Sequence, residues 1–219
     1  SLLPFGMNAA VSASAVSAHP PWQAALELDF ARRGAGTVLA RRNQRGPLTL
    51  QKALYPEGES VCHCVVLHPP GGIVGGDELA LRFRAKEGAH SLRTTPGAAK
   101  WYRSDGPAAA QRVDIELAAG ACCEWLPQET IFFAGAHANS EVSVRLAADA
   151  LAFGWDINCL GRPAAGERFD TGLLRLAVKI EYDGNLLWLE RARLAGGDAL
   201  LASPIGLRNY SVFATAYFA

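Results

Sequence analysis

The sequence predicts an all-β fold, and three observations support this. Apolar and polar residues alternate with a period of two along several segments, helical periodicity is hard to find, and turn-forming residues recur between the alternating segments. About a dozen strands are expected, at roughly the 8 to 12 residue spacing of a sandwich, a barrel or a solenoid. No single repeat period emerges, so the pattern alone does not choose among these architectures.

The alternating segments define the side chains that we expect to face the core. In order along the chain these are Leu26, Leu28, Phe30, Leu81, Phe83, Val113, Ile115, Leu117, Val142, Val144, Leu146, Leu174, Leu176, Val178, Ile180 and Tyr182. Turn signals separate the segments at "RRGAG", "NQRGP", "YPEGE", "AKEGA", "AAGA" and "EYDGN". The last contains Asp-Gly between two alternating runs and predicts a β-hairpin.

Composition narrows the classes of partner and compartment. The 21 Lys and Arg balance the 21 Asp and Glu, so nothing indicates a general nucleic-acid or anionic-membrane partner. Five cysteines, an odd number with two closely spaced pairs, are typical of a reducing cytoplasm rather than a disulfide framework. No apolar run approaches the roughly 18 residues of a membrane helix. We therefore expect a cytoplasmic protein.

The domain organisation is expected to be simple. Residues 1–21 are rich in Ala and Ser and predict a flexible N-terminal tail, and residues 22–219 contain no linker and predict a single domain. The final "NYSVFATAYFA" is apolar to its last residue, whereas natural termini are commonly polar. This favours a domain that lacks its C-terminal segment.

The stretch "VVLHPPGGIVGGDEL", residues 65–79, begins like a phosphate-binding loop. The spacing from Gly71 to Gly76 fits G-x-x-x-x-G, but Asp77 and Glu78 stand where that motif requires Lys and Ser or Thr. Two carboxylates would repel phosphates. The stretch is better interpreted as a stiff corner that ends a buried strand before Asp77.

Thiols and histidines give weaker signals. On a strand, Cys62 and Cys64 face one side and His63 the other, so the three cannot bind one metal ion, and small core residues are the better interpretation. Adjacent Cys122 and Cys123 also face opposite sides and receive no role. His68 has no local catalytic partner, and structural packing is the better interpretation for it.

Four carboxylates lie in unusually apolar or tightly turned settings. Glu190 shares a strand face with Leu, Trp and Ala residues, Asp156 lies among small neighbours that leave room for water, Asp77 follows the glycine corner, and Glu124 lies between Cys and Trp. A carboxylate there is costly unless it is paired, hydrated or facing a cation. Three interpretations remain open for the set: a hydrated acidic path, a two-carboxylate hydrolase site, or unconnected structural pairs.

The segment "TTPGAAKWYRSDG" carries a cluster of aromatic and basic residues in an irregular stretch. Lys100, Trp101, Tyr102 and Arg103 have the composition of a protein-interface hot spot. They could equally form a strand-end cluster that closes the core, and the sequence does not decide between these two interpretations.

Taken together, the segments resemble one known family. "GPLTLQKALYPEG", "CHCVVLHPPGGIVGGDEL", "GAHSLRTTPGAAKWYRSDG", "EWLPQETIFFAGA", "WDINCLGRPAAGERFDTG" and "LLWLERARL" occur in the order and approximate spacing of the urease accessory protein UreD, or UreH, family. The resemblance implies a β-helix-like stack of sheets with few short helices. It also implies a non-enzymatic scaffold that binds UreF and apo-urease, recruits the GTPase UreG through UreF, and delivers nickel, for which an internal water-filled passage has been proposed.

The resemblance also assigns residues. Asp77, Asp156 and Glu190 match the acidic positions of the family and become candidate stations on a nickel path, with Glu124 as a weaker candidate. Relatives often carry a hydroxyl where this chain has Ala99. No tightly bound cofactor is implied, only Ni²⁺ in transit. Two alternatives remain: an all-β hydrolase that uses a pair such as Asp156 and Glu190, and a purely structural adaptor.

Overall fold

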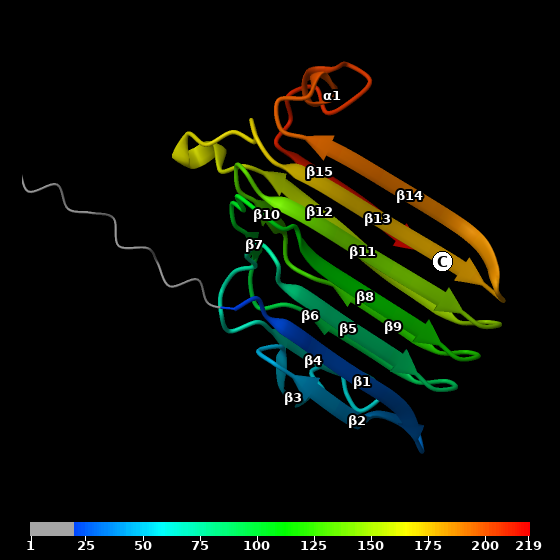
Figure 1. Ribbon diagram of the computed structural model, residues 1–219. Helices are drawn as coiled ribbons and strands as arrows, with labels where there is room; N and C mark the ends of the chain where they lie inside the picture. Colours follow the sequence, from blue (N-terminus) through cyan, green and yellow to red (C-terminus); the bar gives the residue numbers. More distant parts are fainter. Residues whose placement is uncertain (1–19) are drawn as a thin grey trace, which may run out of the picture.

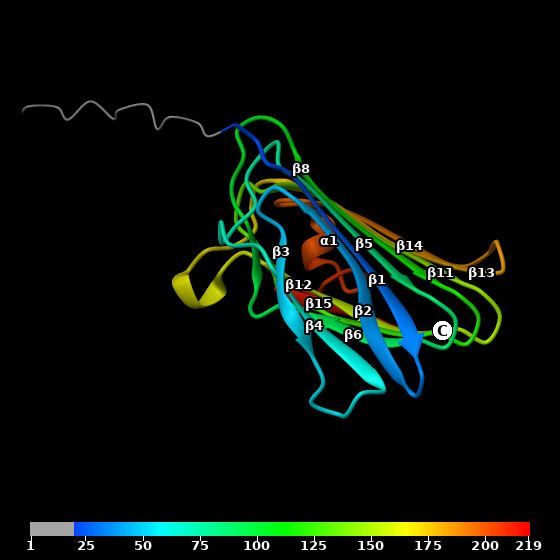
Figure 2. The same ribbon diagram turned by 90° about the horizontal axis from the view of Figure 1, so that it is seen from below.

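The computed structural model describes residues 20–219, so most of the predicted N-terminal tail lies outside the described residues. Two β-sheets lie face to face and enclose one core (Figure 1; Figure 2). In the described part the helices are only the 3₁₀ turn η1 (Pro163–Ala165) and the short α1 (Ala199–Ala202). None of the helices in residues 20–219 has the length and apolarity to cross a membrane.

The two sheets are named here A and B. Sheet A contains, in spatial order, β14 (Asn185–Ala195), β13 (Leu173–Tyr182), β11 (His137–Leu146), β8 (Ala109–Leu117), β5 (Glu78–Ala85), β1 (Gln23–Arg33) and β2 (Gly36–Arg45). Sheet B contains β3 (Thr49–Leu54), β4 (Val61–Leu67), β6 (His90–Thr94), β9 (Cys122–Leu126), β12 (Leu151–Leu160), β10 (Thr130–Phe132) and β7 (Ala99–Trp101), and β15 (Val212–Phe218) pairs with β12.

The chain winds between the sheets and forms a solenoid, which confirms the expected fold class. From β5 to β13 it returns repeatedly to sheet A, and β5, β8, β11 and β13 are parallel neighbours there. Between these strands it visits sheet B. Leu79, Gln111, Ser140 and Leu176 lie in one row across sheet A, so successive turns are offset by 32, 29 and 36 residues. Unequal turns explain why no fixed repeat period appears in the sequence.

The predicted alternation builds the core, except that Tyr182, at the end of β13, is 41% exposed and does not face it as expected. Leu28, Phe83, Ile115, Val144 and Ile180 are neighbours across five strands of sheet A, and each is at most 4% exposed. Burial of each side chain stabilises the fold by roughly 1.5 to 3 kcal/mol relative to exposure.

The predicted hairpin joins β13 to β14. Asp183 and Gly184 have positive φ values of 46° and 76°, as a type I′ turn requires, and the two strands pair in antiparallel fashion. This prediction is confirmed.

β6 reverses the expected pattern, because Ser91 and Arg93 face the core. Arg93 is completely buried, with its guanidinium 4.8 Å from the ring centre of Phe83 and 5.3 Å from that of Phe30. It also donates hydrogen bonds to Ser91 Oγ, at 3.1 Å, and to Cys123 Sγ. Aromatic faces and these acceptors replace part of the water that the guanidinium loses, and its buried Nε has no hydrogen-bond partner in residues 20–219.

The cysteines take the faces that strand geometry predicts. Cys62 and Cys64 are fully buried, and His63 points outward to Glu57 at 2.6 Å. A hydrogen bond from Cys64 lowers the pKa of Cys62 to about 7, against the effect of burial. Cys123 is buried and its neighbour Cys122 is only half-buried, and all five cysteines are free thiols.

Candidate functional site

A cavity of about 190 Å³ lies between the two sheets. Its wall includes Asp156 from β12, His68, the corner residues 71–73 and Ala99, where a hydroxyl is expected in relatives. Water occupies about 30 Å³ per molecule in the liquid, so the cavity has room for several molecules. Apolar lining with a few polar groups is typical of small-ligand passages and sites.

Asp156 is the acidic residue that faces this cavity. Burial raises the pKa of its carboxyl group, and a hydrogen bond from Asn158 on the same strand acts in the opposite direction. The nearby charge of Glu190 raises the pKa further. A carboxylate held in this way is destabilised in its charged form, so a proton or a passing cation would relieve it.

Glu190 reaches Asp156 from the opposite sheet. Thr215 Oγ1 on β15 donates a hydrogen bond of 2.7 Å to Glu190 Oε1 on β14, and Thr215 is the cross-strand neighbour of Asp156 on β12. The structure therefore brings two of the predicted carboxylates together, one from each sheet, with a hydroxyl between them.

The predicted apolar face around Glu190 is only partly buried. Leu194 is 4% exposed, but Leu186 and Trp188 are more than half exposed, because β14 is the edge strand of sheet A. Glu190 itself is half-buried.

The small neighbours of Asp156 suggested that the space beside it would be left to water. The structure differs, because a tyrosine occupies part of this space. A Cβ atom on Gly154 would lie 2.3 Å from Tyr217 Oη, so the tyrosine ring fills the space that the glycine creates. Burial raises the pKa of Tyr217 and keeps its hydroxyl neutral. Tyr217 Oη and Asn158 Oδ1 are buried, and neither atom has a hydrogen-bond partner in residues 20–219. Buried polar atoms of this kind are commonly hydrated.

Asp77 has a different environment. It is 1% exposed, and its two carboxylate oxygens accept backbone N–H groups of Trp22 at 2.8 Å and Val74 at 2.9 Å. Preceding Gly76 has a φ of +90°, a conformation that L side chains rarely adopt. Asp77 therefore ties the glycine corner to the start of the domain and is not among the side chains that line the cavity.

His68 connects the glycine corner to the cavity. It is half-buried, and burial lowers its pKa while the charge of Asp77 acts to raise it. Its Nε2 atom is buried and has no hydrogen-bond partner in the described part of the chain. Packing was the expected role, and the structure adds that this ring forms part of the cavity wall.

Glu124 lies away from the other three carboxylates. Its neighbours Cys123 and Trp125 face the interior, so Glu124 faces outward on sheet B and lies 2.9 Å from His90 Nε2. Hydrogen bonds that the His90 ring donates to Cys122 and to Glu124 raise the pKa of His90 to about 9, against the effect of burial. The structure does not bring Glu124 to the cavity.

The aromatic and basic cluster divides between core and surface. Trp101 is 1% exposed and packs on Phe132 with ring centres 5.7 Å apart, so it is a core residue and not a surface anchor. Lys100, Tyr102 and Arg103 are exposed. Trp101 thus follows the core interpretation, and the interface interpretation stays a prediction for Lys100, Tyr102 and Arg103.

Strong metal binding is not built into the described residues. Within 20–219, no three His, Cys, Asp or Glu side chains are placed to hold one ion together. The carboxylates of Asp156 and Glu190 and the hydroxyl of Thr215 are hard oxygen donors, a type for which borderline cations such as Ni²⁺ have less affinity than for imidazole or thiolate.

Sequence reasoning missed Thr215 and Asn158. A signal for Thr215 exists, because alternation in "VFATAYF" places it on one face with Phe213 and Tyr217 as a single polar residue between two aromatics. Its partner Glu190 is 25 residues away, and only the fold brings them together.

Comparisons with known proteins agree with the resemblance. A family model described as UreD urease accessory protein matches residues 23–219. The urease accessory protein UreD of Dechloromonas aromatica (strain RCB) is 54% identical over 196 residues, which cover 90% of this chain and 68% of that protein. UreD of Azoarcus sp. (strain BH72) is 51% identical over 210 residues, 95% of this chain and 74% of that protein. UreD of Pseudomonas aeruginosa (strain PAO1) is 52% identical over 200 residues, which cover 91% of this chain and 71% of that protein. The chain therefore belongs to the UreD urease accessory protein family.

Proposed function

We propose that this urease accessory protein is a non-catalytic scaffold for nickel insertion that acts in the cytoplasm. It binds UreF and apo-urease, recruits UreG through UreF, and conducts Ni²⁺ through its interior towards the urease active site. Family membership supports the maturation role. The cavity between the sheets and its acidic wall support the internal route.

The observation that carries the proposal is the pair formed by Asp156 and Glu190. Asp156 faces a cavity while burial and the Glu190 charge raise its pKa, an arrangement that disfavours the charged form of Asp156. Two oxygen ligands without a third strong ligand hold a divalent cation briefly, which suits transit better than storage.

In the proposal, Asp77 does not contact the cation but holds part of the cavity wall in place. Both of its oxygens accept backbone N–H groups, so it holds the corner that carries Gly71, Gly72 and Ile73 into the cavity wall. In the proposal, Asp77 keeps the passage in shape, and Asp156 and Glu190 meet the cation.

The test is to replace both transit carboxylates and to measure assembly and metal separately. The Asp156→Ala/Glu190→Ala variant is expected to assemble with UreF and apo-urease in normal amounts and to leave the urease with little nickel and little activity. Glu124→Ala, which removes a carboxylate on the outer face, is the matched control and is expected to support normal activation.

Other outcomes would replace the proposal. Normal nickel content with the double variant would make the protein a structural adaptor without a cation path. Failure of the complex to form would make the pair structural. Hydrolysis of a glycan by the isolated protein, lost in the same variant, would instead favour the hydrolase alternative.

A further inference from the structure

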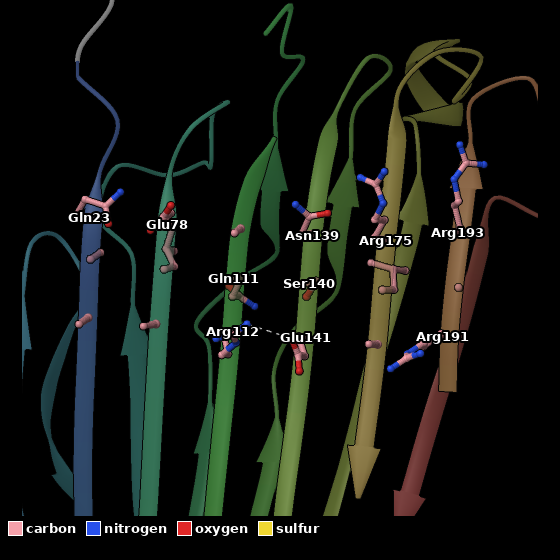
Figure 3. A pocket seen from close by; sticks show the side chains of 18 of the residues that line it. Gln23, Glu78, Gln111, Arg112, Asn139, Ser140, Glu141, Arg175, Arg191 and Arg193 are labelled. Atoms are coloured by element: carbon pink, nitrogen blue, oxygen red, sulfur yellow. Dashed lines mark hydrogen bonds and ion pairs between the residues drawn. The ribbon is translucent and has the colours of Figure 1, made fainter. Parts of the chain in front are cut away.

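The outer face of sheet A, which points away from the core and the cavity, has two dissimilar halves. One half carries paired charges. The other contains a hollow of about 780 Å³ that extends across β1, β5, β8, β11, β13 and β14 (Figure 3). The difference between the halves indicates a function for the hollow.

The paired half shows how this sheet normally treats charge. Acidic and basic side chains alternate between neighbouring strands there and neutralise one another. The pairs between strands are Glu27 with Arg82 at 3.1 Å, Asp29 with Arg84 at 3.2 Å and Glu116 with Arg145 at 2.5 Å, and Lys179 pairs with Glu181 at 2.7 Å within β13.

The floor of the hollow is made of small residues. Ala25, Ala80, Ala110 and Ala177 face outward there, each on a different strand of sheet A. Alanine leaves the backbone nearly uncovered, so another chain could approach the sheet closely. Large outward side chains at these positions would have filled the hollow.

Three arginines stand at one side of the hollow. Arg175 on β13 is the direct cross-strand neighbour of Arg193 on β14, and Arg191 is the next outward residue along β14 (Figure 3). Like charges directly opposite each other on a sheet destabilise it. Within residues 20–219 none of the three has an acidic partner. The hollow contains two carboxylates: Glu141 pairs with Arg112 at 3.4 Å, and Glu78 lies on β5.

We propose that this hollow is the docking site for an acidic segment of a partner protein. Carboxylates of such a segment would bind the guanidinium groups of Arg175, Arg191 and Arg193 in bidentate fashion and relieve their repulsion. Six strands at about 4.8 Å spacing give a floor about 24 Å wide, enough for roughly seven extended residues.

Charge favours a protein segment over a nucleic acid. Glu78 and Glu141 lie in the same hollow and would repel a continuous phosphate backbone, whereas an extended peptide, whose successive side chains point to opposite sides, can turn carboxylates away from them. The chain as a whole also has a formal net charge of zero.

The experiment measures binding of fluorescein-labelled octaglutamate to the full chain by fluorescence anisotropy. Arg175→Gln/Arg193→Gln is expected to weaken binding by about tenfold or more. The matched control is Arg82→Gln/Arg84→Gln on the paired half of the same face, which is expected to change binding by less than about twofold.

Several results would overturn the proposal. They are no binding of octaglutamate to the parent chain, equal weakening by both double variants, or tighter binding of single-stranded octathymidylate than of octaglutamate. Thermal unfolding gives a further check. The Arg175→Gln/Arg193→Gln variant should unfold at or above the parental temperature, and a lower temperature would reveal partners within the chain.

Discussion

The glycine corner and the inner face of β12 each hold a carboxylate that the chain takes out of water, and they do so in different ways. Asp77 receives two backbone N–H groups, one from Trp22 and one from Val74, and is 1% exposed. Asp156 receives a hydrogen bond from Asn158, borders a cavity and lies near a second carboxylate, and its pKa is raised. Asp77 therefore stabilises the fold, whereas the charged form of Asp156 destabilises it.

The difference separates structure from function within a set that looks uniform in sequence. A satisfied buried carboxylate is explained by the backbone groups that it binds. A carboxylate left with a destabilised charge is a functional candidate, because selection for stability alone would replace it. Substitutions at the two regions should therefore act with opposite sign.

The largest effect is expected at the glycine corner. Asp77→Ala removes the acceptor that two partly buried backbone N–H groups share and should lower the free energy of unfolding by about 2 to 4 kcal/mol. Urea-induced unfolding measures this change in the free energy of unfolding. The matched control is Glu78→Gln at the exposed neighbouring position, expected to change stability by less than about 0.5 kcal/mol. Equal stability of the Ala variant and the parent would remove the structural role of Asp77.

A smaller effect of opposite sign is expected at β12. Asp156→Asn should stabilise the chain by about 1 kcal/mol at pH 7, because the amide avoids the buried charge. Since the folded-state pKa of Asp156 is raised, its contribution is most favourable below the unfolded pKa and declines as the pH rises through the folded value. Unfolding followed from pH 4 to 8 should show that decline in the parent and less of it in the variant. Asp149→Asn, at an exposed residue with a φ of 56° that Asn also tolerates, should keep the parental pH dependence.

Removal of the Thr215 hydroxyl beside Glu190 should have a modest effect. Thr215→Val deletes the 2.7 Å hydrogen bond to Glu190 and is expected to cost about 1 kcal/mol in thermal unfolding. It should also reduce urease activation without loss of complex formation. Thr49→Val, which removes an exposed 3.1 Å contact with Gln44, serves as control and should cost less. If the two variants behave alike, the hydroxyl has no particular relation to the acidic pair.

The smallest effect is expected on the outer face of sheet B. Glu124→Gln should leave urease activation unchanged and alter stability by less than about 0.5 kcal/mol, because solvent screens the contact with His90. The raised pKa of His90 contributes stability that is fully present below its ordinary value of 6.5 and is lost as the pH rises through about 9. The variant should remove only a small part of this pH dependence, because the hydrogen bond with Cys122, the larger cause of the raised pKa, stays in place. A defect in activation would place Glu124 on the cation route after all.

Much of the fold could be predicted from the sequence, because alternation reports directly on which strand face is buried. The row containing Leu28, Phe83 and Ile115 is buried as expected, and the Asp183–Gly184 hairpin forms where its turn signal predicts. The order of strands in the two sheets could not be predicted, because unequal turns of the solenoid leave no period to detect. The inward Arg93 also escaped prediction, since aromatic partners from two other strands make its burial tolerable.

The candidate site was predictable as a set of residue types but not as an arrangement. Single carboxylates on apolar faces pointed to Asp77, Asp156 and Glu190. Their division into a structural and a cavity-facing group depends on contacts far apart in the chain, such as the bond between Trp22 and Asp77 across 55 residues. No local pattern records such contacts.

The account rests on the opposite roles of Asp77 and Asp156, and one urea titration at pH 7 tests it most directly. The isosteric variants Asp77→Asn and Asp156→Asn are compared with the parent chain under the same conditions. Asp77→Asn is expected to lower the free energy of unfolding, because the amide nitrogen cannot accept one of the two backbone N–H groups. Asp156→Asn is expected to raise it. Shifts of the same sign in both variants would contradict the account.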